Sequence, residues 1–141
     1  VASKDEELLE KMASTKLYTS ICSAGPSEML AAIALRSGQP LIEANCRIIK
    51  ENVKYFEEFV REVPHLFTWH APRAGSIALV KLLNDEPAKA FCHRTVTEAG
   101  VGLLPSEYFE FGDRYLRIGL GRRNFKECLD VLKDYVTQAK K

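Results

Sequence analysis

The chain has 141 residues, of which 46% are hydrophobic and 28% are charged, a length and balance typical of one globular domain and unlike those of a disordered chain. Twenty basic side chains stand against 19 acidic ones, so the formal net charge is +1, which gives no support for a partner that is a nucleic acid or a membrane surface. The sequence also lacks the apolar run of about 18 residues that a membrane-spanning helix needs.

The first part of the chain is predicted to be helical. Residues 3–6 have the form of a capping box followed by acidic side chains, which predicts a helix that runs to about Tyr18. Pro26 favours the first turn of a second, shorter helix that reaches about Arg36.

The clearest pattern is a long helix from about Gln39 to Val63. Apolar residues recur there at alternating steps of four and three, which places them on one helical stripe: Ile42, Cys46, Ile49, Val53, Phe56 and Val60. A coiled-coil partner would produce the same stripe. With little more than three heptads present, packing on a sheet is the better interpretation.

The remaining segments predict a small sheet with further helices. Strands are expected at residues 67–71, 76–83, 101–104 and 115–119, and helices at about 86–99 and 124–139. The order α-α-α-β-β-α-β-β-α predicts an α/β chain of the α+β kind. We expect a small, mostly antiparallel sheet of three to four strands packed against helices on one side.

Neither the cysteines nor the histidines have the spacing of a metal or catalytic site. These residues are Cys22, Cys46, Cys92, Cys128, His65, His70 and His93. The cysteines form no CxxC pair, and three lie in helix-like apolar stripes, which favours buried, reduced thiols over disulfides or metal ligands. We expect the histidines to be structural or surface residues, and we assign no metal site.

Arg117 is the residue that most needs an explanation. The stretch around it reads as a short strand, where neighbouring side chains point to opposite faces, so Leu116 and Ile118 are expected in a core while Tyr115 and Arg117 share the other face. A guanidinium fixed on a strand is well suited to binding a carboxylate through two parallel hydrogen bonds. A solvated or structurally paired arginine is the alternative that the spacing leaves open.

Four segments, in order along the chain, resemble one known family. Residues 100–121 contain the pattern GVGLLP…F…G…LRIGLG, and residues 67–76 contain FTWHAPRAGS, similar to a strand-turn-strand of the form F.W..P.AGS. Residues 23–36 resemble the opening of an inter-domain helix, and residues 1–12 resemble the piece that follows a catalytic-lysine region. From about residue 1 to about residue 136, the chain thus resembles the C-terminal (small) domain of a class I/II, fold-type-I aminotransferase that depends on pyridoxal phosphate (PLP).

The resemblance implies that Arg117 binds the α-carboxylate of the substrate. It also implies that the Schiff-base lysine and most groups that bind PLP belong to a large domain upstream of this chain. No catalytic or cofactor-binding residue is therefore assigned here, and the isolated chain is expected to be inactive and to bind no PLP. The parent enzyme is expected to be a cytoplasmic homodimer that moves an amino group between an amino acid and a 2-oxo acid.

The expected domain organisation is a single domain over residues 1–141, in which about residues 1–38 are the end of the large-domain or inter-domain helical segment. A different class of function stays open beside the enzyme. A non-catalytic α/β module that binds amino acids or other carboxylates, or that regulates another protein, would keep Arg117 and would not need the lysine.

Overall fold

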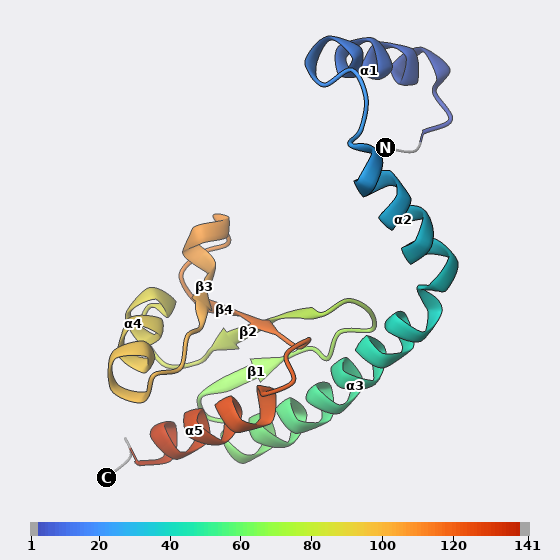
Figure 1. Ribbon diagram of the computed structural model, residues 1–141. Coiled ribbons are helices and arrows are strands. Elements are labelled where there is room, and N and C mark those ends of the chain that lie inside the picture. Colours follow the sequence, from blue (N-terminus) through green and yellow to red (C-terminus); the bar gives the residue numbers. More distant parts are fainter. Residues whose placement is uncertain (1–2, 139–141) are drawn as a thin grey trace. The chain divides into compact units, whose positions relative to one another are not determined.

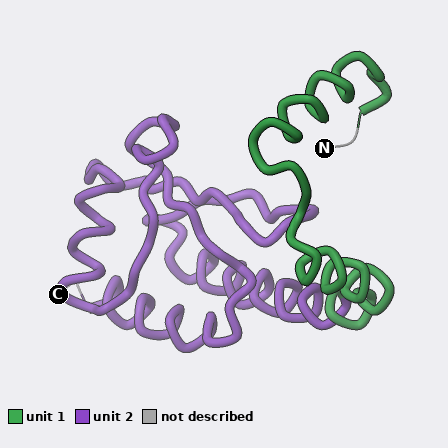
Figure 2. The backbone as a smooth tube through the Cα atoms, turned by 45° about the horizontal axis from the view of Figure 1, so that its top comes forward, with its two compact units in different colours: residues 1–42 green, residues 43–141 purple. Residues whose placement is uncertain are grey.

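The structure is a computed structural model that describes residues 3–138 (Figure 1). Its elements are α1 (Glu6–Thr19), α2 (Gly25–Ser37), α3 (Gln39–Glu62), β1 (Phe67–Trp69), β2 (Ile77–Leu82), α4 (Ala88–Ala99), β3 (Leu104–Pro105), the 3-10 turn η1 (Ser106–Phe109), β4 (Tyr115–Gly119) and α5 (Phe125–Gln138). This order confirms the predicted fold class, and η1 is an addition to it. The chain divides after Ile42 into two compact units, which are described separately (Figure 2).

The first unit contains α1 and α2. The side chain of Asp5 caps α1 by accepting a hydrogen bond from the backbone N–H of Leu8 at 3.0 Å, so the cap lies two residues later than the Ser3 with which the predicted capping box begins. Neither helix has a buried residue. Several large apolar side chains are exposed on them: Leu8, Met12, Leu17, Tyr18, Met29, Leu30, Ile33 and Leu35. Among the described residues, α1 and α2 therefore form no buried core of their own.

The second unit is built on an antiparallel sheet whose strand order, among the described residues, is β1-β2-β4-β3. β4 is an inner strand, with Leu79 of β2 and Leu104 of β3 as the register partners of Arg117 on its two sides. The third strand begins later than the predicted residue 101. Hydrogen bonding along both edges gives β4 a well-fixed backbone.

One face of this sheet is buried beneath helices. Side chains alternate along β2, where Val80 is fully buried while Leu79 is exposed. The buried face meets α3 and α4 through aromatic contacts: the ring centroids of Phe56 and Trp69 lie 4.7 Å apart, and those of Phe67 and Phe91 lie 5.8 Å apart. Four residues of α5 complete the core: Phe125, Leu129, Leu132 and Val136. Among the described residues, the helices of the second unit thus leave the other face of the sheet open (Figure 1).

The long helix packs on the sheet, as predicted, but only along the later part of the predicted stripe, from Ile49 through Val53 and Phe56 to Val60. Phe56 is buried as expected, and Phe59, which is not a member of the predicted stripe, is buried with it. Ile42 and Cys46, by contrast, are exposed. The predicted stripe is wrong at these two positions because the core cluster reaches along α3 only from Ile49 onward.

A buried asparagine of α3 holds the chain where it leaves β4. The side-chain N–H₂ of Asn52 donates to the carbonyl oxygens of Leu120 at 2.9 Å and Arg122 at 2.8 Å. Both donor hydrogens are thereby used inside the protein, which satisfies a polar group that would otherwise be costly to bury. Asn52 therefore fixes the turn after β4 against the long helix.

The cysteines differ in exposure more than predicted. Cys92 is buried in the core, whereas Cys22, Cys46 and Cys128 are exposed, so the prediction of buried thiols is wrong for these three. Burial raises the pKa of the Cys92 thiol to about 12, and the negative charge of Glu107 contributes in the same direction. Since the thiolate is the reactive form, Cys92 is unreactive at neutral pH in the folded chain.

No helix of the described residues is long and apolar enough to cross a membrane.

Replacing Asn52 by Ala is expected to lower the free energy of unfolding by about 1–3 kcal/mol, because two backbone carbonyl groups lose their buried donor. Urea denaturation followed by circular dichroism measures the change. Asn45→Ala is the matched control, since Asn45 is an exposed residue of the same helix. Equal stability of the two variants would show that the Asn52 hydrogen bonds do not hold the turn.

Thiol labelling at neutral pH is expected to modify three cysteines quickly in the folded chain and the fourth only on unfolding, because Cys92 is both buried and protonated. Mass spectrometry after a short pulse with iodoacetamide identifies the labelled positions. Cys92→Ser should remove the slow class alone. Rapid labelling of Cys92 in the folded protein would contradict its placement in the core.

Candidate functional site

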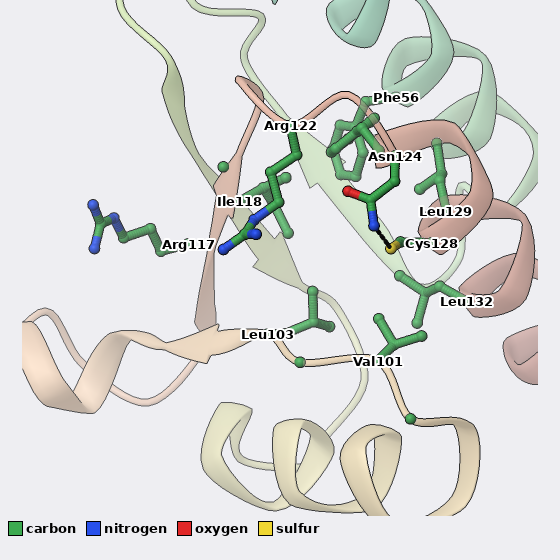
Figure 3. Close-up of a pocket in the computed structure, with 14 residues that line it drawn as sticks. Phe56, Val101, Leu103, Arg117, Ile118, Arg122, Asn124, Cys128, Leu129 and Leu132 are labelled. Atoms are coloured by element: carbon green, nitrogen blue, oxygen red, sulfur yellow. Dashed lines mark hydrogen bonds between the residues drawn. The ribbon is translucent and has the colours of Figure 1, made fainter.

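Arg117 lies in the middle of β4 and projects from the open face of the sheet. Its neighbours Leu116 and Ile118 are 1% and 6% exposed, while Arg117 itself is half-buried. The predicted division of these side chains between the two faces is therefore confirmed. The strand places the base of the arginine side chain in a fixed position, and the side chain extends away from the helix layer (Figure 3).

The guanidinium of Arg117 lies over the ring of Phe109, with its central carbon 5.4 Å from the ring centroid. Within residues 3–138, Arg117 forms no hydrogen bond or ion pair. The ring has no oxygen acceptor, so this contact does not occupy the N–H groups as a carboxylate partner would. These N–H groups have the geometry that binds a carboxylate through two parallel hydrogen bonds.

Arg94 shows what a structurally paired arginine looks like in the same unit. Its guanidinium donates to both carboxylate oxygens of Glu86, at 3.2 and 2.8 Å, and to the hydroxyl oxygen of Tyr135. Hydrogen bonding to Glu86 raises the pKa of Arg94. The contrast excludes, among the described residues, a structural ion pair as the reason for the position of Arg117.

The surface around Arg117 is apolar. Leu79 and Leu104 are its neighbours on the adjacent strands, and both have exposed side chains. Ile77 and Phe109 are also exposed, at 45% and 44%. Because apolar surroundings lower the local dielectric constant, an anion bound here would interact with Arg117 more strongly than it would on an open, hydrated surface.

Ser106 is a residue near this face whose role the sequence did not reveal. It is fully buried, and its hydroxyl donates to the carbonyl oxygen of Gly112 at 2.7 Å and accepts from the backbone N–H of Tyr115 at 3.1 Å. The serine thus joins η1 to the start of β4. In the sequence, a small hydroxyl residue directly after a proline does not indicate a structural role. The role of Ser106 becomes visible only in the structure, where it joins η1 to β4.

A cavity of about 350 Å³ lies beside β4 (Figure 3). Its lining includes apolar side chains of α3, α5 and the segment before β3: Phe56, Val101, Leu103, Phe125, Leu129 and Leu132. Arg117 borders the cavity through its strand, but its side chain points away from the other lining residues (Figure 3). The carboxylate-binding geometry of Arg117 is therefore separate from this cavity.

The described residues show no arrangement for metal chemistry. No group of three or more His, Cys, Asp or Glu side chains in residues 3–138 is placed to hold a metal ion. His65, His70 and His93 are all exposed, so they are surface residues.

No family model and no curated protein matches this chain. Solved structures do match it. A PLP-dependent aminotransferase from Streptococcus suis is 27% identical with a TM-score of 0.82, over 94% of this chain and 35% of its own. The PLP-dependent cyclase OrfR is 22% identical with a TM-score of 0.84, over 95% of this chain and 37% of its own.

An aspartate aminotransferase from Thermotoga maritima is 18% identical with a TM-score of 0.79, over 94% of this chain and 34% of its own. Like the cyclase, it shows a shared fold alone. The chain spans about a third of the length of these solved structures, a share consistent with a small C-terminal domain. The predicted resemblance is confirmed: this chain resembles the small C-terminal domain of the PLP-dependent aminotransferases.

Proposed function

We propose that this chain is the small domain of a PLP-dependent aminotransferase and that Arg117 binds the α-carboxylate of its amino-acid substrate. The observation that carries the proposal is a half-buried arginine without an acidic partner among residues 3–138, on an open sheet face with exposed apolar neighbours. The likeness to the Streptococcus suis aminotransferase supports the enzyme class.

Arg117 would act by orientation. Two parallel N–H···O bonds fix both the position and the plane of a carboxylate, which a lysine ammonium cannot do. Because β4 is an inner strand, the backbone of Arg117 is already held in place before a substrate binds. Covering the open face with another part of the enzyme would exclude water and strengthen the contact.

PLP stabilises the carbanion formed at the substrate Cα by acting as an electron sink. Residues 3–138 do not fit the cofactor by themselves. The cavity beside β4 is lined by no lysine, and the described lysines are exposed, apart from half-buried Lys133, which pairs with Glu62. We therefore infer that the Schiff-base lysine and the cofactor-binding groups belong to a separate large domain, and that this chain alone is inactive.

The substrates proposed for the complete enzyme are an amino acid and a 2-oxo acid, with a homodimer as its assembly. The matched structures include both an aspartate aminotransferase and a cyclase, so they do not select one amino acid or one reaction. The carboxylate that all amino acids share is the group that Arg117 fits.

For the domain organisation, we infer that the first unit is the end of the large-domain or inter-domain helical segment. Its two helices have no buried residue and expose many large apolar side chains. Helices of this kind need a further apolar surface to pack against. The core cluster, in contrast, draws all its members from Ile49 onward.

Residues 43–141 are expected to fold without the first unit, because the core cluster lies wholly within them. Thermal unfolding followed by circular dichroism should stay cooperative, with a midpoint within about 4 °C of the whole chain, which corresponds to less than about 1 kcal/mol. A chain that ends before α5 is the control, and it should lose cooperative unfolding together with Leu129, Leu132 and Val136. Loss of folding in residues 43–141 would overturn the division.

In the complete enzyme, Arg117→Ala is expected to raise the KM for the amino acid and to lower kcat/KM at least about tenfold, since substrate binding and orientation are both weakened. Steady-state kinetics with several amino acids measures the change. Arg117→Lys keeps the charge and loses the paired geometry, so it should restore activity only in part.

Arg123→Ala is the matched control, because Arg123 is exposed in the turn that follows β4 and should leave the kinetics within about twofold. Unchanged kinetics in Arg117→Ala would remove the proposed role. An absorbance titration of the complete protein with PLP separates the enzyme from a non-catalytic carboxylate-binding module, which would bind no cofactor.

A further inference from the structure

We propose that Phe109 is a positioning residue for Arg117 and that the loop from Ser106 to Tyr115 is built to hold its ring in place. The inference rests on the proposed function, since it concerns the residue that would bind the carboxylate. It adds a residue outside β4: the strand fixes the backbone of Arg117, and the loop fixes the position of its guanidinium.

Phe109 contacts the guanidinium of Arg117. An arginine side chain has several rotatable bonds and loses considerable freedom when it is held in one arrangement. Within residues 3–138, no acid or carbonyl group holds Arg117, and the ring of Phe109 lies 5.4 Å from its central carbon. An acidic side chain at position 109 would compete with a ligand for the N–H groups, whereas an aromatic ring has no oxygen acceptor with which to occupy them.

Hydrogen bonds close the loop that carries Phe109. The buried hydroxyl of Ser106 bonds to both Gly112 and Tyr115, at 2.7 and 3.1 Å. The backbone N–H of Phe111 donates to the carbonyl oxygen of Ser106 at 3.2 Å, and Gly112 has the positive φ that this return of the chain requires. Phe109 is therefore carried by a closed turn, although its own side chain is 44% exposed.

Hydrogen bonds also attach this loop to the start of α4. The first N–H groups of a helix have no partner within the helix. Here the N–H of Ala88 donates to the carbonyl oxygen of Asp113 at 2.7 Å, and the N–H of Lys89 donates to Oε1 of Glu107 at 3.0 Å. The carboxylate of Glu107 is also favoured by the positive end of the helix dipole. The start of α4 thus anchors the two sides of the loop that presents Phe109.

The environment of the neighbouring aromatic residues supports this reading. Phe111 packs against Tyr115 with ring centroids 5.1 Å apart, so it belongs to the closure of the loop. Tyr108 is 66% exposed on the same turn as Phe109. It provides a matched aromatic position that does not lie against the guanidinium of Arg117.

The test uses the present chain, labelled with ¹⁵N, and follows the Nε–Hε signal of Arg117 by NMR. Relaxation of this signal reports the mobility of the guanidinium, and titration with sodium acetate reports carboxylate binding, with sodium chloride at equal ionic strength as the reference. Phe109→Leu is expected to increase the mobility and to weaken acetate binding about threefold, a change in keeping with a partly exposed cation–π contact. Phe109→Tyr, which keeps the ring, should behave as the unmodified chain does.

Tyr108→Leu is the control and should change neither quantity. Ser106→Ala opens the closure of the loop without touching the ring, and it is expected to increase the mobility of Arg117 as well. The amide spectrum shows whether each variant keeps the fold, and the exposed position of Phe109 makes its replacement compatible with folding.

Unchanged mobility of Arg117 in Phe109→Leu would overturn the inference, whatever the result of the acetate titration. The proposed function has a different point of failure. Absence of any acetate-specific shift in the unmodified chain would count against Arg117 as a carboxylate-binding residue, while the mobility measurement would still decide the role of Phe109.

Discussion

The burial of the sheet on one face is the constraint on which the rest of the structure depends. Because side chains alternate along a strand, covering one face of β4 with helices forces Leu116 and Ile118 inward and Arg117 outward. The same alternation in β2 leaves Leu79 beside the arginine. A cation in an apolar surround thus follows from the way the sheet packs, and it needs no special backbone conformation at Arg117.

The hydrogen bonds of the second unit keep this arrangement in place at both ends of β4. Ser106 holds the chain at the start of the strand through Tyr115, and Asn52 holds it after the end of the strand through Leu120 and Arg122. Buried polar groups that are fully hydrogen-bonded specify one arrangement of the segments they join. The inner position of β4 and these two attachments together make the strand a firm support for a binding residue.

Part of the candidate site was predictable because it depends on local periodicity. The strand at residues 115–119, the inward direction of its two aliphatic side chains and the outward direction of Arg117 all follow from a repeat of two residues. Asn52 left no such signal, because it lies outside the apolar stripe predicted for the long helix. Its two acceptors lie 68 and 70 residues away in the sequence, and no local pattern identifies them.

The sequence by itself determined the order of helices and strands, the sheet-packing role of the long helix and the face from which Arg117 projects, because each depends on neighbours within a few residues. Tertiary structure alone decided that α3 is buried only from Ile49 onward, that three of the cysteines are exposed and that Phe109 lies against Arg117. These outcomes depend on where the core ends and on which distant segments meet. Which side chains are buried and which contact one another depends on how the layers pack together, whereas periodicity depends on the sequence alone.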